Sequence, residues 1–168
     1  MLKRVTAYQP DPVSGALSVL DAVTDSYWRR PPSFPDAGGR LVSTIDDYWA
    51  FVQMIIDKGT YRGERIISEA SVQRMTTDHL NSDQRTRASN FLGDHGGWGF
   101  GMLVPASGVQ VTGIPGGFGW DGGTGTTWRS DLDRGITGIL FTPRELMSPE
   151  QPETFVDFWS CTYASISD

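Results

Sequence analysis

The sequence predicts an α+β domain in which helices pack on an antiparallel sheet. Apolar residues recur at three- and four-residue steps near residues 45–56 and again after residue 148. Short strand-like runs separated by glycine-rich turns fill residues 98–143 between these helices. Consecutive strands joined by short turns pair as antiparallel neighbours, so one sheet with a helix before it and a helix after it is expected.

Residues 1–35 are predicted to form an irregular or extended lead-in. The run Tyr8–Gly15 is rich in turn-forming residues, and Ala16–Val23 could hold one strand. Pro31, Pro32 and Pro35 follow, and these prolines exclude a helix.

Residues 36–77 are predicted to be helical. The periodic run from Ile45 to Ile56 follows two candidate N-caps, Ser43 and Thr44, and it precedes Gly59, a usual residue after a helix end. A shorter helix is expected to begin at Ser68 and to end near Thr77.

Residues 78–97 show no apolar period, so a mobile polar surface loop is expected there, with a lid as the alternative. The chain has two histidines, His79 and His95, and both lie in this segment without the spacing of a zinc site. They are interpreted as solvated side chains.

Antiparallel strands are expected over residues 98–143. Trp98, Phe100, Met102 and Val104 alternate with smaller residues, which predicts one half-buried strand. After a turn at 105–108, Val109 and Val111 begin the next strand, and the glycine-rich run from Gly113 leads to strands at Thr126–Asp131 and Gly135–Thr142. Glycines inside strands usually mark bulges or places where a ligand or another backbone comes close.

A final helix is predicted over residues 148–167. Ser148 is the expected N-cap, Pro149 the first helical residue and Gln151 the capping-box partner. Phe155, Trp159, Tyr163 and Ile166 form the apolar stripe of this helix.

Composition narrows the possible partners. The formal net charge is −6 and the pI is near 4.8, which argues against nucleic acid as a partner. No apolar run approaches the ~20 residues of a membrane span. The first residues do not have the pattern of a secretory signal, and the compartment stays open: the cytoplasm is expected only if Met1 is the native start. The single cysteine, Cys161, is interpreted as a small packing residue.

A search for catalytic motifs finds no activated nucleophile. A Ser-x-x-Lys motif needs a lysine, and neither Lys3 nor Lys58 has a serine three positions earlier. No Gly-x-Ser-x-Gly elbow is present, and the glycine-rich runs 97–101 and 122–125 do not open a helix as phosphate loops do. Neither a metal nor a cofactor is predicted.

Four motifs in order resemble the C-terminal part of the serine β-lactamase family, in the branch of class C β-lactamases, D-aminopeptidases and esterases. They are Gly38-Gly-Arg-Leu-Val-Ser-Thr-Ile-Asp46, Gly59-x-x-x-Gly63-Glu-Arg-Ile-Ile-Ser68, Gly97-Trp-Gly-Phe-Gly101 and Gly119-Trp-Asp-Gly-Gly-Thr-Gly125. The resemblance implies the C-terminal portion of a β-lactamase/transpeptidase-like fold, one partial domain spanning residues 1–168.

The resemblance also implies a site. The family's Lys-Thr-Gly or His-x-Gly motif, on an edge strand, corresponds to Trp120-Asp121-Gly122. The amide of the next residue, Gly123, would be an oxyanion-hole donor, and Trp120, Asp121, Gly122 and Thr124 would contact substrate. The alternative is that Trp120 simply packs and that the glycines form a bulge. Tyr163-Ala-Ser165 imitates the family's tyrosine motif, but it lies on the final helix and is interpreted as chance.

The family's serine and tyrosine motifs lie upstream of the matched region. The chain is therefore expected to be a lobe of a serine hydrolase that is inactive alone. The substrate is expected to be a small ester or amide. Trp120 offers no charge to a substrate carboxylate and Asp121 adds a negative one, which favours an ester over a β-lactam or a peptide; a binding domain that keeps only the fold is the alternative. The strand Gly135–Thr142 is expected to pair with an N-terminal lobe, with a second copy or with a segment from Met1–Val23.

Overall fold

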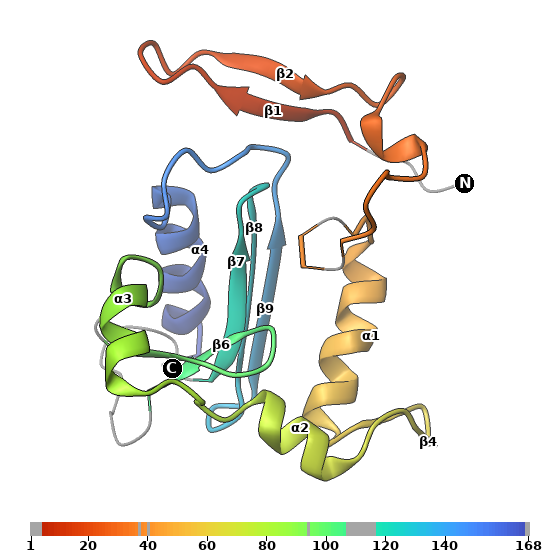
Figure 1. Cartoon of the computed structure of the whole chain (residues 1–168), viewed down its shortest axis with the longest axis vertical. Helices are drawn as coiled ribbons and strands as arrows, with labels where there is room; N and C mark the ends of the chain where they lie inside the picture. Colours follow the sequence, from red (N-terminus) through yellow and green to blue (C-terminus); the bar gives the residue numbers. More distant parts are fainter. Residues whose placement is uncertain (1–4, 37, 40, 94, 107–116, 167–168) are drawn as a thin grey trace.

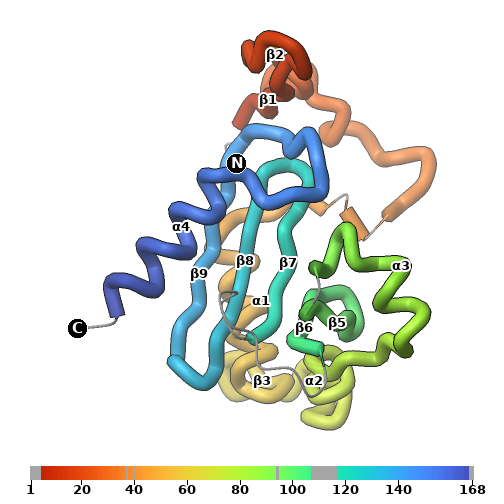
Figure 2. The backbone as a smooth tube through the Cα atoms, turned by 90° about the vertical axis from the view of Figure 1, so that its left-hand side faces the viewer, coloured from red at the N-terminus to blue at the C-terminus, as the bar shows by residue number. Residues whose placement is uncertain are grey.

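A five-stranded antiparallel sheet lies between helices α1 and α4 in the computed structural model (Figure 1). The structure describes residues 5–36, 38–39, 41–93, 95–106 and 117–166. The strand order is β5-β6-β7-β8-β9, so neighbours in sequence are neighbours in the sheet (Figure 2). The predicted α+β class is confirmed. The strands are β5 Gly96–Trp98, β6 Leu103–Pro105, β7 Phe118–Gly122, β8 Thr126–Asp131 and β9 Ile136–Phe141.

The first two helices begin and end close to where the sequence predicts. Helix α1 (Ile45–Ile56) is capped by Thr44, whose Oγ1 accepts the Asp47 amide at 3.1 Å. Gly59 stops the chain after this helix with a φ of 91°, and its amide donates to the Met54 carbonyl at 2.7 Å. Helix α2 (Glu69–Met75) is capped by Ser68, and the short strands β3 (Thr60–Tyr61) and β4 (Glu64–Arg65) lie between the two helices.

The main core lies between α1 and the sheet. Trp128 of β8 is 2% exposed and forms edge-to-face contacts with Tyr48, Phe51 and Phe118 at centroid distances of 5.4, 5.9 and 5.7 Å. Buried aliphatic side chains from both layers complete this core; they are Val52, Met54, Ile55, Val72, Met102 and Val104.

Helix α4 (Glu153–Ala164) covers the other face of the sheet. Gly138 permits this contact, because a Cβ there would lie 2.7 Å from the ring of Trp159. Trp159 also donates its indole N–H to Thr127 Oγ1 at 3.0 Å. Phe155 and Trp159 are buried as predicted, but Ile166 is 46% exposed and does not extend the stripe.

The start predicted for α4 is wrong. The structure places the N-cap at Pro152, not at Ser148. The residue before a proline avoids helical backbone angles, so a helix starting at Ser148 would break at Gln151. Ser148 still accepts the Glu150 amide, at 3.3 Å, but in a turn that precedes the helix.

The predicted polar loop at 78–97 is also wrong, because this segment contains helix α3 (Ser82–Leu92) and β5. A capping box begins the helix: Asn81 accepts the Gln84 amide at 2.9 Å, and Gln84 accepts the Asn81 amide at 3.0 Å. Arg85 then binds Asp78 at 2.7 Å, and the Asp78 side chain is only 2% exposed. Caps and ion pairs stabilise this polar helix, so it carries almost no apolar period.

The single strand predicted over 98–104 is a hairpin of β5 and β6. The Gly99 amide donates to the Met102 carbonyl at 3.0 Å, and Gly101 turns the chain with a φ of 83°. The tip residue Phe100 is 55% exposed. The strand predicted at Val109 and Val111 lies outside the described residues, as does much of the turn at 105–108.

The lead-in is more ordered than predicted. It forms an antiparallel hairpin of β1 (Ala7–Pro10) and β2 (Leu17–Asp21), followed by a short 3-10 helix at Tyr27–Arg29. Asp11 organises the hairpin turn by accepting the Ser14 amide and hydroxyl at 2.7 and 2.8 Å. The Tyr8 amide donates to the Pro143 carbonyl at 2.7 Å, so β1 runs beside the segment that follows β9 (Figure 1).

Candidate functional site

The predicted site residues lie at the end of β7 and in the turn that leads to β8. Gly122 pairs with Thr126 across the two strands, so Gly123, Thr124 and Gly125 form the connection. The Gly125 amide donates to the Gly122 carbonyl at 3.0 Å, and Gly125 has a φ of 90°. A short turn closed by a glycine with positive φ is a usual hairpin connection.

This turn fixes the direction of the Gly123 amide. The Gly122 carbonyl points across the turn toward Gly125. The peptide bond between Gly122 and Gly123 is trans and planar, so the Gly123 N–H points the opposite way, out of the turn. Among the described residues, no backbone hydrogen bond outside the helices and strands uses this N–H as a donor.

The prediction that this strand lies at the edge of the sheet is wrong. β7 is third of five, with β6 on one side and β8 on the other. However, the pairing of β6 with β7 is confined to Leu103 and Gly119, because the β5–β6 hairpin is short. Gly123 follows the last β7 residue and lies beyond this pairing.

Trp120 and Asp121 do not contact the same partners, because successive side chains of a strand point to opposite faces. Trp120 forms an edge-to-face contact with Trp98 of β5, with 4.6 Å between centroids and 84° between planes. The structure therefore gives Trp120 an aromatic neighbour that the motif comparison did not identify.

Asp121 enters an internal ion pair. Its Oδ2 accepts from Arg129 Nη2 and from Gln151 Nε2, both at 2.8 Å. The Arg129 side chain is 5% exposed and that of Asp121 is 19% exposed. The other oxygen, Oδ1, is buried without a hydrogen-bond partner in the described part of the chain, so Oδ2 makes all of these contacts. Asp121 therefore does not add an unpaired negative charge beside Trp120.

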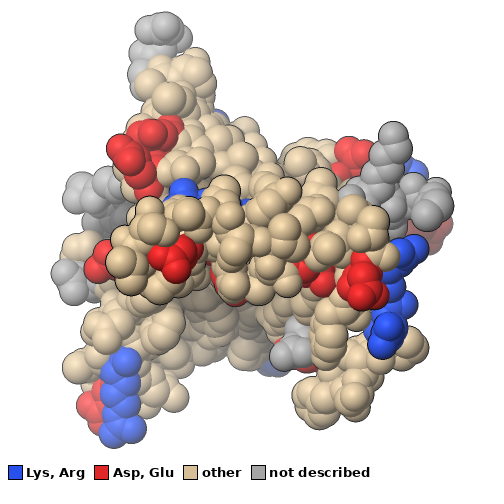
Figure 3. Space-filling model, turned by 90° about the horizontal axis from the view of Figure 1, so that it is seen from above, with Lys and Arg blue, Asp and Glu red and all other residues tan. Residues whose placement is uncertain are grey.

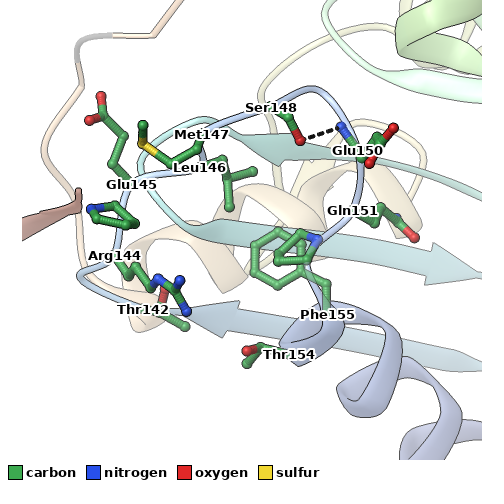
Figure 4. A pocket seen from close by; sticks show the side chains of 12 residues that line it. Thr142, Arg144, Glu145, Leu146, Met147, Ser148, Glu150, Gln151, Thr154 and Phe155 are labelled. Carbon is green, nitrogen blue, oxygen red and sulfur yellow. Dashed lines mark hydrogen bonds between the residues drawn. The ribbon is translucent and has the colours of Figure 1, made fainter. Parts of the chain in front are cut away.

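The turn is also bound by the segment after β9. The Leu146 amide donates to the Gly123 carbonyl at 2.7 Å, and Thr142 donates both its amide and its hydroxyl to the Gly125 carbonyl at 2.9 and 2.7 Å. A hollow of about 440 Å³ lies between this segment and α4, with Arg144, Leu146, Met147, Ser148, Gln151 and Phe155 among its lining residues (Figure 4). No local spacing predicts these contacts, because 23 positions of the sequence separate Gly123 from Leu146.

The other residues that the sequence singled out for possible chemistry lie away from the Gly122–Gly125 turn. His79 stacks on Phe100 at 4.6 Å, and its Nε2 lies 2.7 Å from the Arg74 carbonyl, so it supports the β5–β6 hairpin. Tyr163 donates to Asp131 at 3.1 Å at the far end of β8 from Gly123. Burial and this hydrogen bond raise the pKa of the Tyr163 hydroxyl. Cys161 is exposed, so the packing role predicted for it is wrong.

No helix within the described ranges is long and apolar enough to cross a membrane. Three or more potential metal ligands do not come together anywhere in the part of the chain that the structure describes. On the face seen from the β1–β2 hairpin, the charged side chains of the described residues are scattered and form no single basic patch (Figure 3).

Comparison with known proteins identifies the family. The Beta-lactamase family profile matches residues 3–155. Protein Rv1367c of Mycobacterium tuberculosis (strain ATCC 25618 / H37Rv) is 43% identical over 111 residues, which cover 60% of this chain and 27% of that protein. Uncharacterized protein MT1414 of strain CDC 1551 / Oshkosh matches with the same identity and coverage.

A solved structure shares the fold. A LovD6 mutant of simvastatin synthase (LovD) from Aspergillus terreus superposes with a TM-score of 0.71 at 16% identity, covering 97% of this chain and 42% of that one. The chain thus spans about a quarter of the curated relatives and less than half of the solved structure. Because the family profile covers most of its length, the chain belongs to the beta-lactamase family.

Proposed function

We propose that the chain is the sheet-bearing C-terminal lobe of a serine hydrolase that acts on esters. In the intact protein a serine from outside this chain attacks the ester carbonyl, and the carbonyl electrons move onto oxygen. The alkoxide or alcohol leaves, and water then releases the acid from the serine. The direction of the Gly123 N–H carries this proposal, since an outward-pointing backbone amide can donate to the developing oxyanion without rearrangement.

The neighbouring side chains support an ester in preference to a β-lactam. Trp120 and Trp98 present apolar rings where a family member with a Lys-Thr-Gly motif has a cation. Asp121 is paired with Arg129 on the opposite face of the strand, so the preference rests on the uncharged Trp120 and not on Asp121. A neutral ester has no carboxylate that needs a lysine.

The chain by itself is expected to be inactive, because the sequence contains neither a Ser-x-x-Lys motif nor a serine elbow. Incubation with nitrocefin and with p-nitrophenyl esters should give no turnover above background. Hydrolysis that a serine-directed fluorophosphonate abolishes would overturn this part of the proposal.

The oxyanion role can be tested in a longer protein that joins this chain to an upstream Ser-x-x-Lys segment. Gly123→Pro removes the N–H, and proline suits this second position of the turn because Gly123 does not have a positive φ. We expect kcat for ester hydrolysis to fall ~100- to 1,000-fold, as for other lost oxyanion donors.

Gly123→Ala is the matched control. It keeps the N–H, and its added Cβ meets no atom within 4 Å, so kcat should stay close to that of the parent. Equal kcat values for the proline and alanine variants would remove Gly123 from the site. The chain would then be better described as a binding domain that keeps the family fold.

A further inference from the structure

We propose that residues 143–151, here named the anchoring segment, position the Gly123 amide. This inference rests on the proposed function, because it concerns the donor that would stabilise the oxyanion. The anchoring segment holds the chain on both sides of that donor. Leu146 binds the Gly123 carbonyl at 2.7 Å, and Gln151 binds the Asp121 carboxylate at 2.8 Å.

The need for anchoring follows from two adjacent glycines. Gly122 and Gly123 have no Cβ, and glycine adopts positive and negative φ with similar ease. Rotation about the bonds that flank their shared peptide would turn the Gly123 N–H into the turn and would remove it from an incoming oxyanion. Local side chains cannot prevent this rotation, so it is opposed by the hydrogen bond from the Gly125 amide to the Gly122 carbonyl and by the contacts on either side of the glycine pair.

The two contacts hold different parts of the turn. Leu146 fixes the peptide that follows Gly123, because it binds the carbonyl of that peptide. Gln151 and Arg129 hold the Asp121 side chain just before the glycine pair. With both neighbours fixed and the Gly122 carbonyl bound to the Gly125 amide, one direction remains for the Gly123 N–H.

The anchoring segment is itself held in place by distant parts of the chain. Tyr8 of β1 donates to Pro143 at 2.7 Å and accepts from the Glu145 amide at 2.8 Å. The segment then loops over the hollow that Phe155 of α4 closes from the other side (Figure 4). The position of the donor thus depends on both the N-terminal hairpin and the final helix.

Nuclear magnetic resonance on the 15N-labelled chain tests the positioning directly. The probes are the hydrogen exchange of the Leu146 amide and the 15N relaxation of Gly123. Gln151→Ala removes the charge-assisted hydrogen bond to the Asp121 carboxylate. We expect hydrogen exchange of the Leu146 amide to become about tenfold faster as a result. Gly123 should gain motion, while the Trp128 amide in the middle of β8 should be unchanged.

Two further variants separate positioning from general stability. Gln151→Lys keeps a donor that can reach Asp121 and should restore the parent exchange rate. Gln73→Ala changes an exposed glutamine on α2 and should leave both probes unchanged. Unchanged probes in Gln151→Ala would overturn the proposal. A uniform loss of hydrogen-exchange protection that includes the Trp128 amide would also overturn the proposal, because it would show that Gln151 only stabilises the fold as a whole.

Kinetics of the longer protein distinguish the positioning of Gly123 by the anchoring segment from the oxyanion role of Gly123. If Gly123 is the oxyanion donor, Gln151→Ala should lower kcat several-fold and leave KM nearly unchanged, because the amide acts on the transition state. A more mobile Gly123 with an unchanged kcat would keep the positioning inference and would overturn the oxyanion role.

Discussion

Strand β8 begins and ends at turns that are stabilised in different ways. At its end, Asp131 accepts the Arg134 amide at 3.1 Å and the Arg134 guanidinium at 2.8 Å, so the turn to β9 is held mainly by its own residues, with one further bond from Tyr163 of α4. At its start, the Gly122–Gly125 turn is held by Thr142 and Leu146 from the segment after β9. The first kind of turn follows from local chemistry, whereas the second requires the folded sheet.

The two ends of β8 also differ in how their ion pairs are buried. Arg129, which serves the candidate site, has a side chain that is 5% exposed, while the Arg134 side chain is 60% exposed. The site end therefore buries its cation, whereas the other end exposes its cation and buries the Asp131 carboxylate, whose side chain is 2% exposed. Substitutions at matched positions can test this difference.

The largest effect is expected from the buried arginine. Arg129→Met leaves the partly buried Asp121 carboxylate without its cation and should cost about 4 kcal/mol in the free energy of unfolding. Arg134→Met removes a mostly exposed cation, and the buried Asp131 carboxylate keeps its bonds from the residue 134 amide and from Tyr163, so this change should cost about 1 kcal/mol. Urea denaturation measures both changes.

The double variant Arg129→Met/Asp121→Asn is the control for this comparison. It removes the unpaired carboxylate as well, so it should recover much of the lost stability. Equal losses in Arg129→Met and Arg134→Met would contradict the contrast between the two ends.

A smaller effect is expected from the glycines of the two turns. Both have positive φ, 90° at Gly125 and 67° at Gly135, so alanine is strained at either position. A Cβ at Gly125 would also collide with the Arg144 carbonyl oxygen, whereas one at Gly135 meets nothing within 4 Å. We expect thermal unfolding to report a loss of about 3 kcal/mol for Gly125→Ala and about 1 kcal/mol for Gly135→Ala. A larger loss at Gly135 would reverse the comparison.

The smallest effect concerns pH. Burial alone would raise the pKa of Asp131, but hydrogen bonds from Arg134 and Tyr163 outweigh it and lower that pKa. A carboxyl group with a lowered pKa in the folded state stabilises the fold above its unfolded pKa of ~3.9, and this contribution disappears as the pH falls. The stability difference between the parent chain and Asp131→Asn should therefore shrink below about pH 4. Urea midpoints that differ by the same amount from pH 3 to pH 6 would argue against this titration.

The sequence by itself determined the parts of this protein that depend on neighbours along the chain. Helix α1 was predictable because its N-cap at Thr44 and its stop at Gly59 are local features. Strand β8 was predicted with its observed bounds, and β9 to within a residue at each end, because alternating side chains and turn residues mark them. Helix α3 could have been found from its Asn81 and Gln84 capping box, but its polar composition hid the helical period.

Only the tertiary structure decided what surrounds the candidate site. The sequence placed Trp120–Thr124 together and suggested an edge strand, but the pairing of β6 with β7 is a contact between separate segments. The same is true of Arg129 and Gln151 around Asp121, and of Leu146 at Gly123. Hydrogen bonds between distant residues follow from how the sheet, the anchoring segment and α4 pack, and no local spacing encodes that packing.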